Sequence, residues 1–495
     1  MNSGGIFRDA PSRRASSRWI SWALVLAAAL AIRLYRLGYF SYWLDEILDT
    51  YLIRARWENV WRALREQGLQ APLDYVIRKA FEAFGPGEAL RRIPGVISGV
   101  GCVAAFGALF ARRGGRSAGV ACAAMLAIAP YHVRYSQEVR PYSLGLFLLA
   151  LSLLCLEHFL ERPGAGRLAL LFTACLGTLY SLYLAALLLL LTAASIVMSD
   201  CFDREPHRRA AARRFLMWSP AFVAVLALGY LPWWPVLVRA IRLPPDSGAP
   251  AAFGLSRVVR WFAYFGPRGQ DFVNVGPAEI LFAALVVAGT VVAWRRPRLR
   301  FLLVWAAGGL AAVEWLERRH PQFDSIFHWL PAGLGLTALA GVGTAAILQS
   351  RVLRPVGVII LAAALVTDAR GLRDYFRSGR PDWRPVARFL SARPKDERLY
   401  VENPYALFCV AFYLCGPDWP PCKGPGGRYA VSVHGDVPTL LQAWGRDRDA
   451  WLLLAAGPRS ESLRSWSREL PSMTFPTAEG DGAVLRRLSP AGGAR

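Results

Sequence analysis

The chain has 495 residues, of which 54% are hydrophobic and only 19% are charged. A soluble protein of this length usually carries more polar residues, so the composition favours a protein that crosses a membrane several times. The formal net charge of +23 comes almost entirely from arginine and would also suit a nucleic-acid-binding protein. The arginines, however, stand in short clusters between apolar runs, as loop charges do in membrane proteins. We therefore expect no nucleic-acid partner.

The apolar runs predict about eleven transmembrane helices, several of them shorter than the roughly 20 residues of a perpendicular span. The first run is interpreted as an uncleaved span because many more follow; a cleaved signal peptide is the alternative, with Ala29-Leu30-Ala31 as its site. The stretch 168–199 fits either two short helices broken near Tyr180-Ser181 or one long tilted helix. The predicted spans are 19–32, 93–111, 117–131, 141–159, 168–179, 181–199, 215–238, 277–294, 299–316, 327–347 and 354–367.

Every second loop between these runs is short and rich in arginine, which places those loops and the N-terminus in the cytoplasm. The intervening loops are longer and aromatic, and we expect them on the outer side. An odd number of spans would put the C-terminal part outside as well. The expected outer loops are 38–90, 131–141, 239–276 and 317–328.

The composition changes at about residue 368, where strand-like pieces such as "RYAVSV" and "AWLLLAA" alternate with helix-like ones. This alternation predicts a small α/β domain. We therefore divide the chain into a membrane domain, 1–367, and an extracytoplasmic α/β domain, 368–495. The α/β part contains no GxGxxG and no P-loop motif, so nothing indicates nucleotide binding. Whether Cys415 and Cys422 form a disulfide is left open.

The first outer loop contains an acidic pair, Asp45 and Glu46, directly after an apolar run. Apolar residues then recur on one helical face as far as Leu64, and "GLQAPLDYVIRKAFEAFG" predicts a second helix within 68–85. Amphipathic helices of this kind lie in the membrane interface. One interpretation is that Asp45 caps the first helix, whose dipole favours negative charge. The other is that Asp45 accepts a proton from an incoming nucleophile.

The loop "APYHVRYSQEVRPYSLGLF" places Arg134, Glu138 and Arg140 among tyrosines. Arg134 and Glu138 are spaced as an ordinary surface ion pair on a helix, and tyrosines are common at membrane interfaces. Charged residues that converge from two outer loops would instead form a polar pocket beside lipid.

Several motifs together resemble those of the GT-C membrane glycosyltransferases. They are, in chain order, "YWLDEILDTY", "APLDYVI", "LRRIPGVISGV" and "RYSQEVRPYSL", with "RPDWRPVARFL" after the last span. The sequence is most similar to the bacterial family-39-like enzymes, which are related to protein O-mannosyltransferases and to the lipid A aminoarabinose transferase. The resemblance implies a GT-C fold with interfacial helices in the first outer loop. It also implies that a sugar is transferred, with inversion, from a polyprenyl phosphate to an acceptor at the extracytoplasmic face.

The resemblance assigns roles to particular residues. Asp45 would be the general base, with Glu46 beside it and Glu138 as the second acidic position. The lipid phosphate would be held by arginine and histidine side chains, which suit a departing phosphate. These candidates are Arg134, Arg140, Arg319 and His328. The substrate pocket would include Tyr42, Pro72, Tyr75, Tyr135 and Tyr142.

The resemblance implies no obligatory cofactor, and the alternative is a divalent ion held by Asp45, Glu46 and Glu138. The sequence departs from the family at Gln70-Ala71, where a His or Lys often precedes the prolines, so the resemblance carries no phosphate or acceptor contact over to this position. The expected partners are membrane lipids, the polyprenyl-phosphate sugar, and an acceptor that is a lipid, a protein or a polysaccharide. The implied location is the bacterial inner (cytoplasmic) membrane, with the C-terminal domain in the periplasm or outside the cell.

Two other functions are compatible with the composition. A transporter or lipid flippase would place ionisable residues near the middle of the membrane. Here the predicted spans are nearly free of charge apart from Glu314, towards the end of one of them. A non-catalytic relative in envelope assembly would use the C-terminal domain as a binding module.

Overall fold

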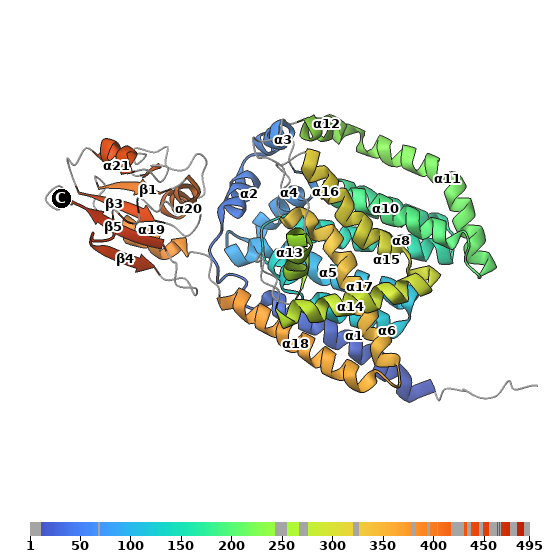
Figure 1. Ribbon diagram of the computed structural model, residues 1–495. Coiled ribbons are helices and arrows are strands. Elements are labelled where there is room, and N and C mark those ends of the chain that lie inside the picture. Colours follow the sequence, from blue (N-terminus) through green and yellow to red (C-terminus); the bar gives the residue numbers. More distant parts are fainter. Residues whose placement is uncertain are drawn as a thin grey trace, which may run out of the picture. The chain divides into compact units, whose positions relative to one another are not determined.

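The computed structural model describes residues 11–489, apart from 68–69, 243–254, 267–275, 320–325, 378–381, 394–396, 403, 417–429, 433–436, 445–448, 455–462, 464, 466 and 476–482. Most of the chain is helical (Figure 1). The chain forms two compact units. The first, called the helical unit, comprises Met1–Tyr35, Gly95–Ser136 and Pro141–Leu372. The second, called the mixed unit, comprises Arg36–Pro94, Gln137–Arg140 and Arg373–Arg495.

Each apolar run of the sequence lies in a helix. The long helices of the chain and their connections are α1 (Pro11–Leu34), α5 (Glu88–Gly114), α6 (Arg116–Ile128), α7 (Pro130–Ser136), α8 (Tyr142–Glu161), α9 (Ala165–Leu179), α10 (Tyr183–Asp200), α11 (Pro206–Tyr230), η2 (Leu231–Trp233), α12 (Trp234–Arg242), α13 (Leu255–Phe265), α14 (Pro277–Arg295), η3 (Pro297–Leu299), α15 (Phe301–Leu303), η4 (Val304–Gly308), α16 (Gly309–Arg319), η6 (Ile326–Trp329), α17 (Leu330–Gln349) and α18 (Arg354–Arg377). The stretch 168–199 is thus two helices, α9 and α10, with the break at Tyr180-Ser181.

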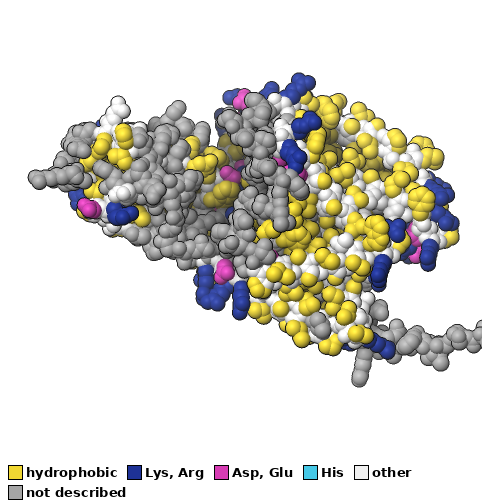
Figure 2. Space-filling view, viewed as in Figure 1, with side chains coloured by type: hydrophobic (Ala, Val, Ile, Leu, Met, Phe, Trp, Pro, Cys, Tyr) yellow, Lys and Arg dark blue, Asp and Glu magenta, His cyan; other side chains and the backbone are white. Residues whose placement is uncertain are grey.

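Within the described residues, seven helices are long and apolar enough to cross a membrane. They are Glu88–Gly114, Tyr142–Glu161, Tyr183–Asp200, Pro206–Arg242, Pro277–Arg295, Pro297–Arg319 and Phe327–Gln349. Shorter apolar helices accompany them, such as Trp19–Leu34 and Ala165–Leu179. Figure 2 shows hydrophobic side chains over much of the visible surface of these helices. The count of about eleven spans stays a prediction.

Helix α17 forms the centre of the helical unit and is buried along nearly its whole length (Figure 1). Its sequence "LPAGLGLTALAGVGTAAILQ" contains glycines where other helices approach. A Cβ at Gly343 would lie 2.2 Å from the carbonyl oxygen of Leu285 in α14, and one at Gly289 would lie 1.8 Å from that of Leu339. The backbones of α14 and α17 can pack this closely only because these positions lack a side chain.

The mixed unit joins the first loop to a C-terminal sheet. Its helices are α2 (Leu44–Arg54), α3 (Trp57–Gln67), α4 (Leu73–Phe81), η1 (Glu82–Phe84), α19 (Trp383–Ser391), α20 (Pro404–Cys415) and α21 (Val437–Trp444). Its strands are β1 (Arg398–Val401), β2 (Ala430–Ser432), β3 (Ala450–Leu454), β4 (Ser472–Phe475) and β5 (Ala483–Leu488). The described strands pair in the order β2-β1-β3-β5-β4, parallel at β2-β1-β3 and antiparallel at β3-β5-β4. The predicted α/β region is confirmed.

The segment after Glu46, which we expect at the membrane interface, is two helices rather than the one that its periodicity predicts. Ala55 is extended, with φ −61° and ψ 160°, and ends α2. The Lys79 ammonium, from α4, donates to the carbonyl oxygens of Ile53 and Ala55 at 2.9 and 2.5 Å. A cation at the end of a helix satisfies carbonyls that have no intrahelical partner, which stabilises the break.

The predicted division of the chain at 367/368 stays a prediction, and two features of the structure bear on it. The boundary at 367/368 falls inside α18, which continues to Arg377. The C-terminal residues group with the first loop, 36–94, in the mixed unit. The disulfide between Cys415 and Cys422 involves a residue outside the described part of the chain.

Candidate active site

The acidic pair lies in the first turn of α2. Trp43 is the N-cap residue, with φ −93° and ψ 172°, and Leu44 begins the helix. Asp45 is therefore one position inside the helix, and its interpretation as the N-cap is wrong. Glu46 reaches back instead, because its carboxylate accepts the Trp43 backbone N–H at 3.5 Å. Both carboxylates still lie where the helix dipole favours negative charge.

Glu46 is fully buried and forms a two-pronged ion pair with Arg92 from α5. Arg92 Nε and Nη2 lie 3.0 Å from Glu46 Oε1 and Oε2, respectively. Arg92 Nη1 also donates to the carbonyl oxygens of Leu37 and Phe40, both at 2.9 Å. Glu46 Oε1 accepts a further bond from the Val139 backbone N–H at 2.9 Å. A buried carboxylate needs this full set of donors, so Glu46 holds the loop around 139 against α2.

Arg140 lies between two carboxylates of α2. Its Nη1 donates to Asp49 Oδ2 at 2.9 Å, and its Nη2 lies 3.5 Å from Asp45 Oδ2. Asp45 and Asp49 are one helical turn apart, so both side chains are on the same face of α2. The Asp45 side chain keeps 27% of its surface exposed, whereas those of Asp49 and Arg140 keep 7% and 8%. Asp45 is thus the carboxylate of this group that an external molecule can reach.

Asp49 is held by Tyr75 as well as by Arg140. The Tyr75 hydroxyl donates to Asp49 Oδ1 at 2.6 Å and also contacts Gln70 Oε1. Burial raises the pKa of Asp49 to about 6, against the opposing effects of Arg140 and the Tyr75 hydrogen bond. The neighbouring carboxylates of Asp74 and Asp45 add to the increase in pKa. Asp49 therefore titrates near neutral pH beside the reachable carboxylate.

A second buried ion pair fixes the backbone of the same loop. Arg78 Nε lies 2.6 Å from Asp74 Oδ2 within α4. Arg78 Nη1 and Nη2 donate to the carbonyl oxygens of Arg91 and Arg140, both at 2.8 Å. The loop 137–140 is therefore tied to α2 by Glu46 and Asp49 and to α4 by Arg78.

The C-terminal segment contacts both ends of the first loop, 36–94. The Tyr413 hydroxyl, from α20, donates to Glu88 Oε1 and accepts the Tyr42 backbone N–H, both at 2.7 Å. The Phe412 ring packs edge to face against Tyr42 and Tyr51, with centroids 5.8 and 5.3 Å apart. Helix α20 thus supports the residues that lead into α2.

The structure brings some of the predicted site residues together in the mixed unit. Asp45, Glu46, Tyr42, Pro72 and Tyr75 lie on the first loop and its helices, and Glu138 and Arg140 lie on the loop 137–140. Glu138 is fully buried, as is Tyr42, whose ring lies 5.1 Å from the Arg92 guanidinium carbon.

The remaining predicted residues belong to the helical unit. Tyr135 and Tyr142 are buried, with ring centroids 5.1 Å apart, and the Tyr135 hydroxyl bonds that of Tyr264 at 2.7 Å. Arg134 lies over the Tyr135 ring, Arg319 lies over the Trp315 ring, and His328 packs on Phe327. Their roles as phosphate or substrate contacts stay predictions.

Sequence reasoning missed four residues that hold this site together: Asp49, Asp74, Arg78 and Arg92. Two signals were available in the spacing. Asp49 is one turn after Asp45, and Arg78 is one turn after Asp74. The choice of Arg92 as the partner of Glu46 had no local signal, because it depends on a tertiary contact.

The acidic residues do not fit a metal centre. Both oxygens of Glu46 are engaged by Arg92, and Arg140 lies against Asp45. Within the described residues, no three His, Cys, Asp or Glu side chains come together as metal ligands. We therefore derive no step through a metal ion.

No protein-family model matches the chain, and no curated protein sequence matches it significantly. Its structure is similar to that of ArnT from Cupriavidus metallidurans bound to undecaprenyl phosphate, with a TM-score of 0.55 and 14% identity over 95% of this chain and 98% of that one. The apo form of ArnT from the same organism has a TM-score of 0.54 and 14% identity, over 96% of this chain and 99% of that one. The oligosaccharyltransferase of Archaeoglobus fulgidus in complex with Zn and sulfate has a TM-score of 0.50 and 11% identity, over 86% of this chain and 67% of that one.

This likeness extends over nearly the whole chain and agrees with the seven long apolar helices. The fold expected from the sequence motifs is therefore confirmed: the chain is an integral membrane protein with the GT-C fold.

Proposed function

We propose that this chain is a glycosyltransferase that moves a sugar from a polyprenyl-phosphate donor to an acceptor at the extracytoplasmic membrane face. The observation that carries the proposal is a reachable carboxylate, Asp45, fixed beside a buried guanidinium, Arg140, in a GT-C fold. The donor class is supported by ArnT, a protein of the same fold whose structure contains undecaprenyl phosphate.

In the proposed reaction, Asp45 acts as the general base. A carboxylate oxygen of Asp45 accepts the proton of an acceptor hydroxyl while the hydroxyl oxygen bonds to the anomeric carbon of the sugar. The bond from that carbon to the phosphate oxygen breaks, and its electron pair leaves on the polyprenyl phosphate. A single displacement of this kind inverts the configuration at the anomeric carbon.

Arg140 has two tasks in this proposal. In the absence of substrate it pairs with both Asp45 and Asp49, at 3.5 and 2.9 Å. When the donor binds, its Nη2 turns from Asp45 to a phosphate oxygen, where a guanidinium stabilises the charge of the leaving group. Asp45 Oδ2 is then released from its contact with Nη2 and can accept the proton of the acceptor hydroxyl. Asp49 keeps its bond to Nη1 and holds the guanidinium in the site.

Glu46 and Arg78 are positioning residues in this account. Each fixes the backbone of the loop that carries Arg140, through the Val139 N–H and the Arg140 carbonyl oxygen. Neither side chain needs to contact the substrate. The acceptor is unassigned and is a lipid, a protein or a polysaccharide.

The experiment is a comparison of membrane lipids and envelope glycans by mass spectrometry in cells with and without this protein. Loss of one glycan modification, with accumulation of its polyprenyl-phosphate sugar, is expected in its absence. Wild-type protein should restore the modification, and Asp45→Asn should not, although it reaches the membrane in equal amount. Identical lipid and glycan profiles with and without the protein would refute the proposed function.

A further inference from the structure

A basic pocket lies in the helical unit where the ends of three helices meet. Arg112 comes from the last turn of α5, Glu161 ends α8, and Arg167 lies in the first turn of α9. The pocket encloses about 400 Å³, a volume that suits a small polar ligand. Its lining consists of Arg112, Cys155, His158, Glu161, Arg162, Arg167 and Leu170.

The lining carries an excess of positive charge. Three arginines face one carboxylate, so the formal charge of the lining is +2 with His158 neutral. Arg112 bonds Glu161, and both side chains are about one-third exposed. Arg167 donates to the backbone carbonyl oxygen of Arg162. Within the described part of the chain, neither Arg162 nor Arg167 forms an ion pair, so both guanidinium charges are available to an anion.

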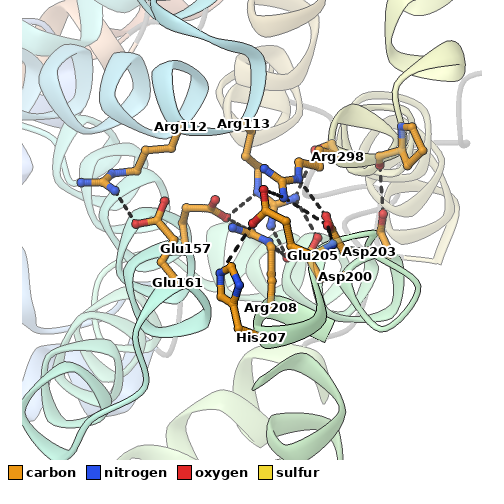
Figure 3. Close-up of polar contacts among 12 residues, drawn as sticks. Arg112, Arg113, Glu157, Glu161, Asp200, Asp203, Glu205, His207, Arg208 and Arg298 are labelled. Atoms are coloured by element: carbon orange, nitrogen blue, oxygen red, sulfur yellow. Dashed lines mark hydrogen bonds and ion pairs between the residues drawn. The ribbon is translucent and has the colours of Figure 1, made fainter. Parts of the chain in front are cut away.

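This excess contrasts with the neighbouring charges, which balance one another. Figure 3 shows Arg112 turned towards Glu161, while Arg113 points into a separate buried network. In that network Arg113 and Arg208 each lie 2.6–2.7 Å from Glu157 and Asp200. Two arginines and two carboxylates cancel there, as expected for charges taken out of water. The pocket arginines are outside this arrangement.

The position of the pocket indicates the kind of anion. Helix α8 has 20 residues, about the length that crosses the hydrocarbon layer, so a membrane-spanning α8 would place its end at Glu161 at headgroup level. The side chain of Leu170 in α9 lines the pocket and is 53% exposed, so it adds an apolar surface at its rim. A ligand that satisfies both features has an anionic head and apolar chains.

We propose that this pocket binds the phosphodiester headgroup of an anionic membrane phospholipid. The phosphate would lie between Arg162 and Arg167, and the acyl chains would begin against the exposed Leu170 of α9. We expect the pocket to bind an anionic lipid more tightly than a zwitterionic one, because Arg162 and Arg167 have no carboxylate partners among the described residues and attract net negative charge. The proposal does not depend on the sugar-transfer activity.

The test uses full-length protein purified in an uncharged detergent and native mass spectrometry. The probes are dioctanoyl phosphatidylglycerol, dioctanoyl phosphatidylcholine and inorganic phosphate. We expect the phosphatidylglycerol to be retained, the phosphatidylcholine to bind about tenfold more weakly, and equimolar phosphate not to displace the lipid. Displacement by phosphate alone, or equal retention of the two lipids, would refute the lipid assignment.

Variants locate the site. Arg162→Gln with Arg167→Gln should weaken phosphatidylglycerol binding by about tenfold or more. Arg295→Gln with Arg296→Gln removes the same charge from exposed arginines at the end of α14 and should leave binding unchanged. Glu161→Gln should strengthen binding, an increase that a misfolded protein would not give. Equal binding by the pocket variant and the wild type would overturn the proposal.

Discussion

At Asp49, a carboxylate is held nearly out of solvent between a guanidinium and a phenol. Its hydrogen bonds favour the ionised form, but burial outweighs them and raises the pKa from 3.8 to about 6. Its neighbour Asp45, on the same helical face, remains partly exposed. The two carboxylates share one cation, Arg140, but have different environments. The buried Asp49 fixes the Arg140 side chain, and the partly exposed Asp45 is open to a substrate.

The titration of Asp49 predicts how stability depends on pH. Between pH 3.8 and about 6 the folded protein keeps a proton that the unfolded chain gives up, so stability should fall as pH rises through this window. At about 1.4 kcal/mol per pKa unit, the effect is no more than about 3 kcal/mol. The Tm of the wild type minus that of Asp49→Asn, measured in detergent, should therefore decrease from pH 4 to pH 7. A difference that stays constant, or grows, would contradict this assignment.

The Glu46–Arg92 pair predicts a large effect of a conservative change. Arg92→Gln leaves the fully buried Glu46 carboxylate without its cation, which typically costs about 3–5 kcal/mol. Arg56→Gln is the control, because the Arg56–Glu58 pair is mostly exposed, at 83% and 68%, and is worth less than about 1 kcal/mol. Thermal unfolding in detergent should show a much lower Tm for Arg92→Gln only. Similar Tm values for both variants would show that Glu46 is not held as described.

Among the elements, the apolar runs were sufficient to predict the helices, because a long run of leucine and alanine has no stable alternative in lipid. The break between α2 and α3 was not predictable, since it depends on Lys79 reaching two carbonyl groups from another helix. The alternation of strands and helices after 368 predicted the α/β region, but not that three strands would pair in parallel and two antiparallel.

The contact between α14 and α17 predicts opposite effects for two glycine substitutions. Gly289→Ala would place a methyl group 1.8 Å from the carbonyl oxygen of Leu339, so the helices must separate. Gly166→Ala meets nothing within 4 Å in α9 and should be neutral or stabilising by up to about 1 kcal/mol. We expect Gly289→Ala to lower Tm and to reduce the yield of monodisperse protein. Equal Tm values for the two variants would contradict the close packing.

At the scale of the whole molecule, the first loop, Arg36–Pro94, and the C-terminal segment, Arg373–Arg495, belong to one unit. Most of the helical unit separates these two segments in the chain. The sequence predicted that charged residues of the first loop and of the loop around 138 come together, and Glu46 and Asp49 do contact Val139 and Arg140; that these loops carry the site stays a prediction. The sequence did not predict that α20 would support α2, because "PYALFCVAFYLC" is apolar throughout and contains no feature that indicates which helix it packs against. Long-range pairing is where sequence reasoning was weakest, as with Glu46 and Arg92.

This support by α20 is testable at Tyr413. Tyr413→Phe removes the acceptor of the Tyr42 N–H and the donor to Glu88, so hydrogen exchange at the Tyr42 amide should become faster. Tyr405→Phe on the same helix is the control, because the Tyr405 side chain is exposed. Unchanged protection at Tyr42 in Tyr413→Phe would show that the C-terminal segment does not hold the first loop.

The most direct test of the central claim is the rate of polyprenyl phosphate release by purified protein. Lipid-linked sugars extracted from the native membrane serve as donors, an extract of the envelope serves as the acceptor, and release is followed by mass spectrometry. Asp45→Asn removes the proposed base without changing its size and should lower the rate by about 10²–10⁴-fold. Asp374→Asn, at an exposed aspartate of α18, should retain the wild-type rate. A folded Asp45→Asn protein that releases polyprenyl phosphate as fast as the wild type would contradict the account.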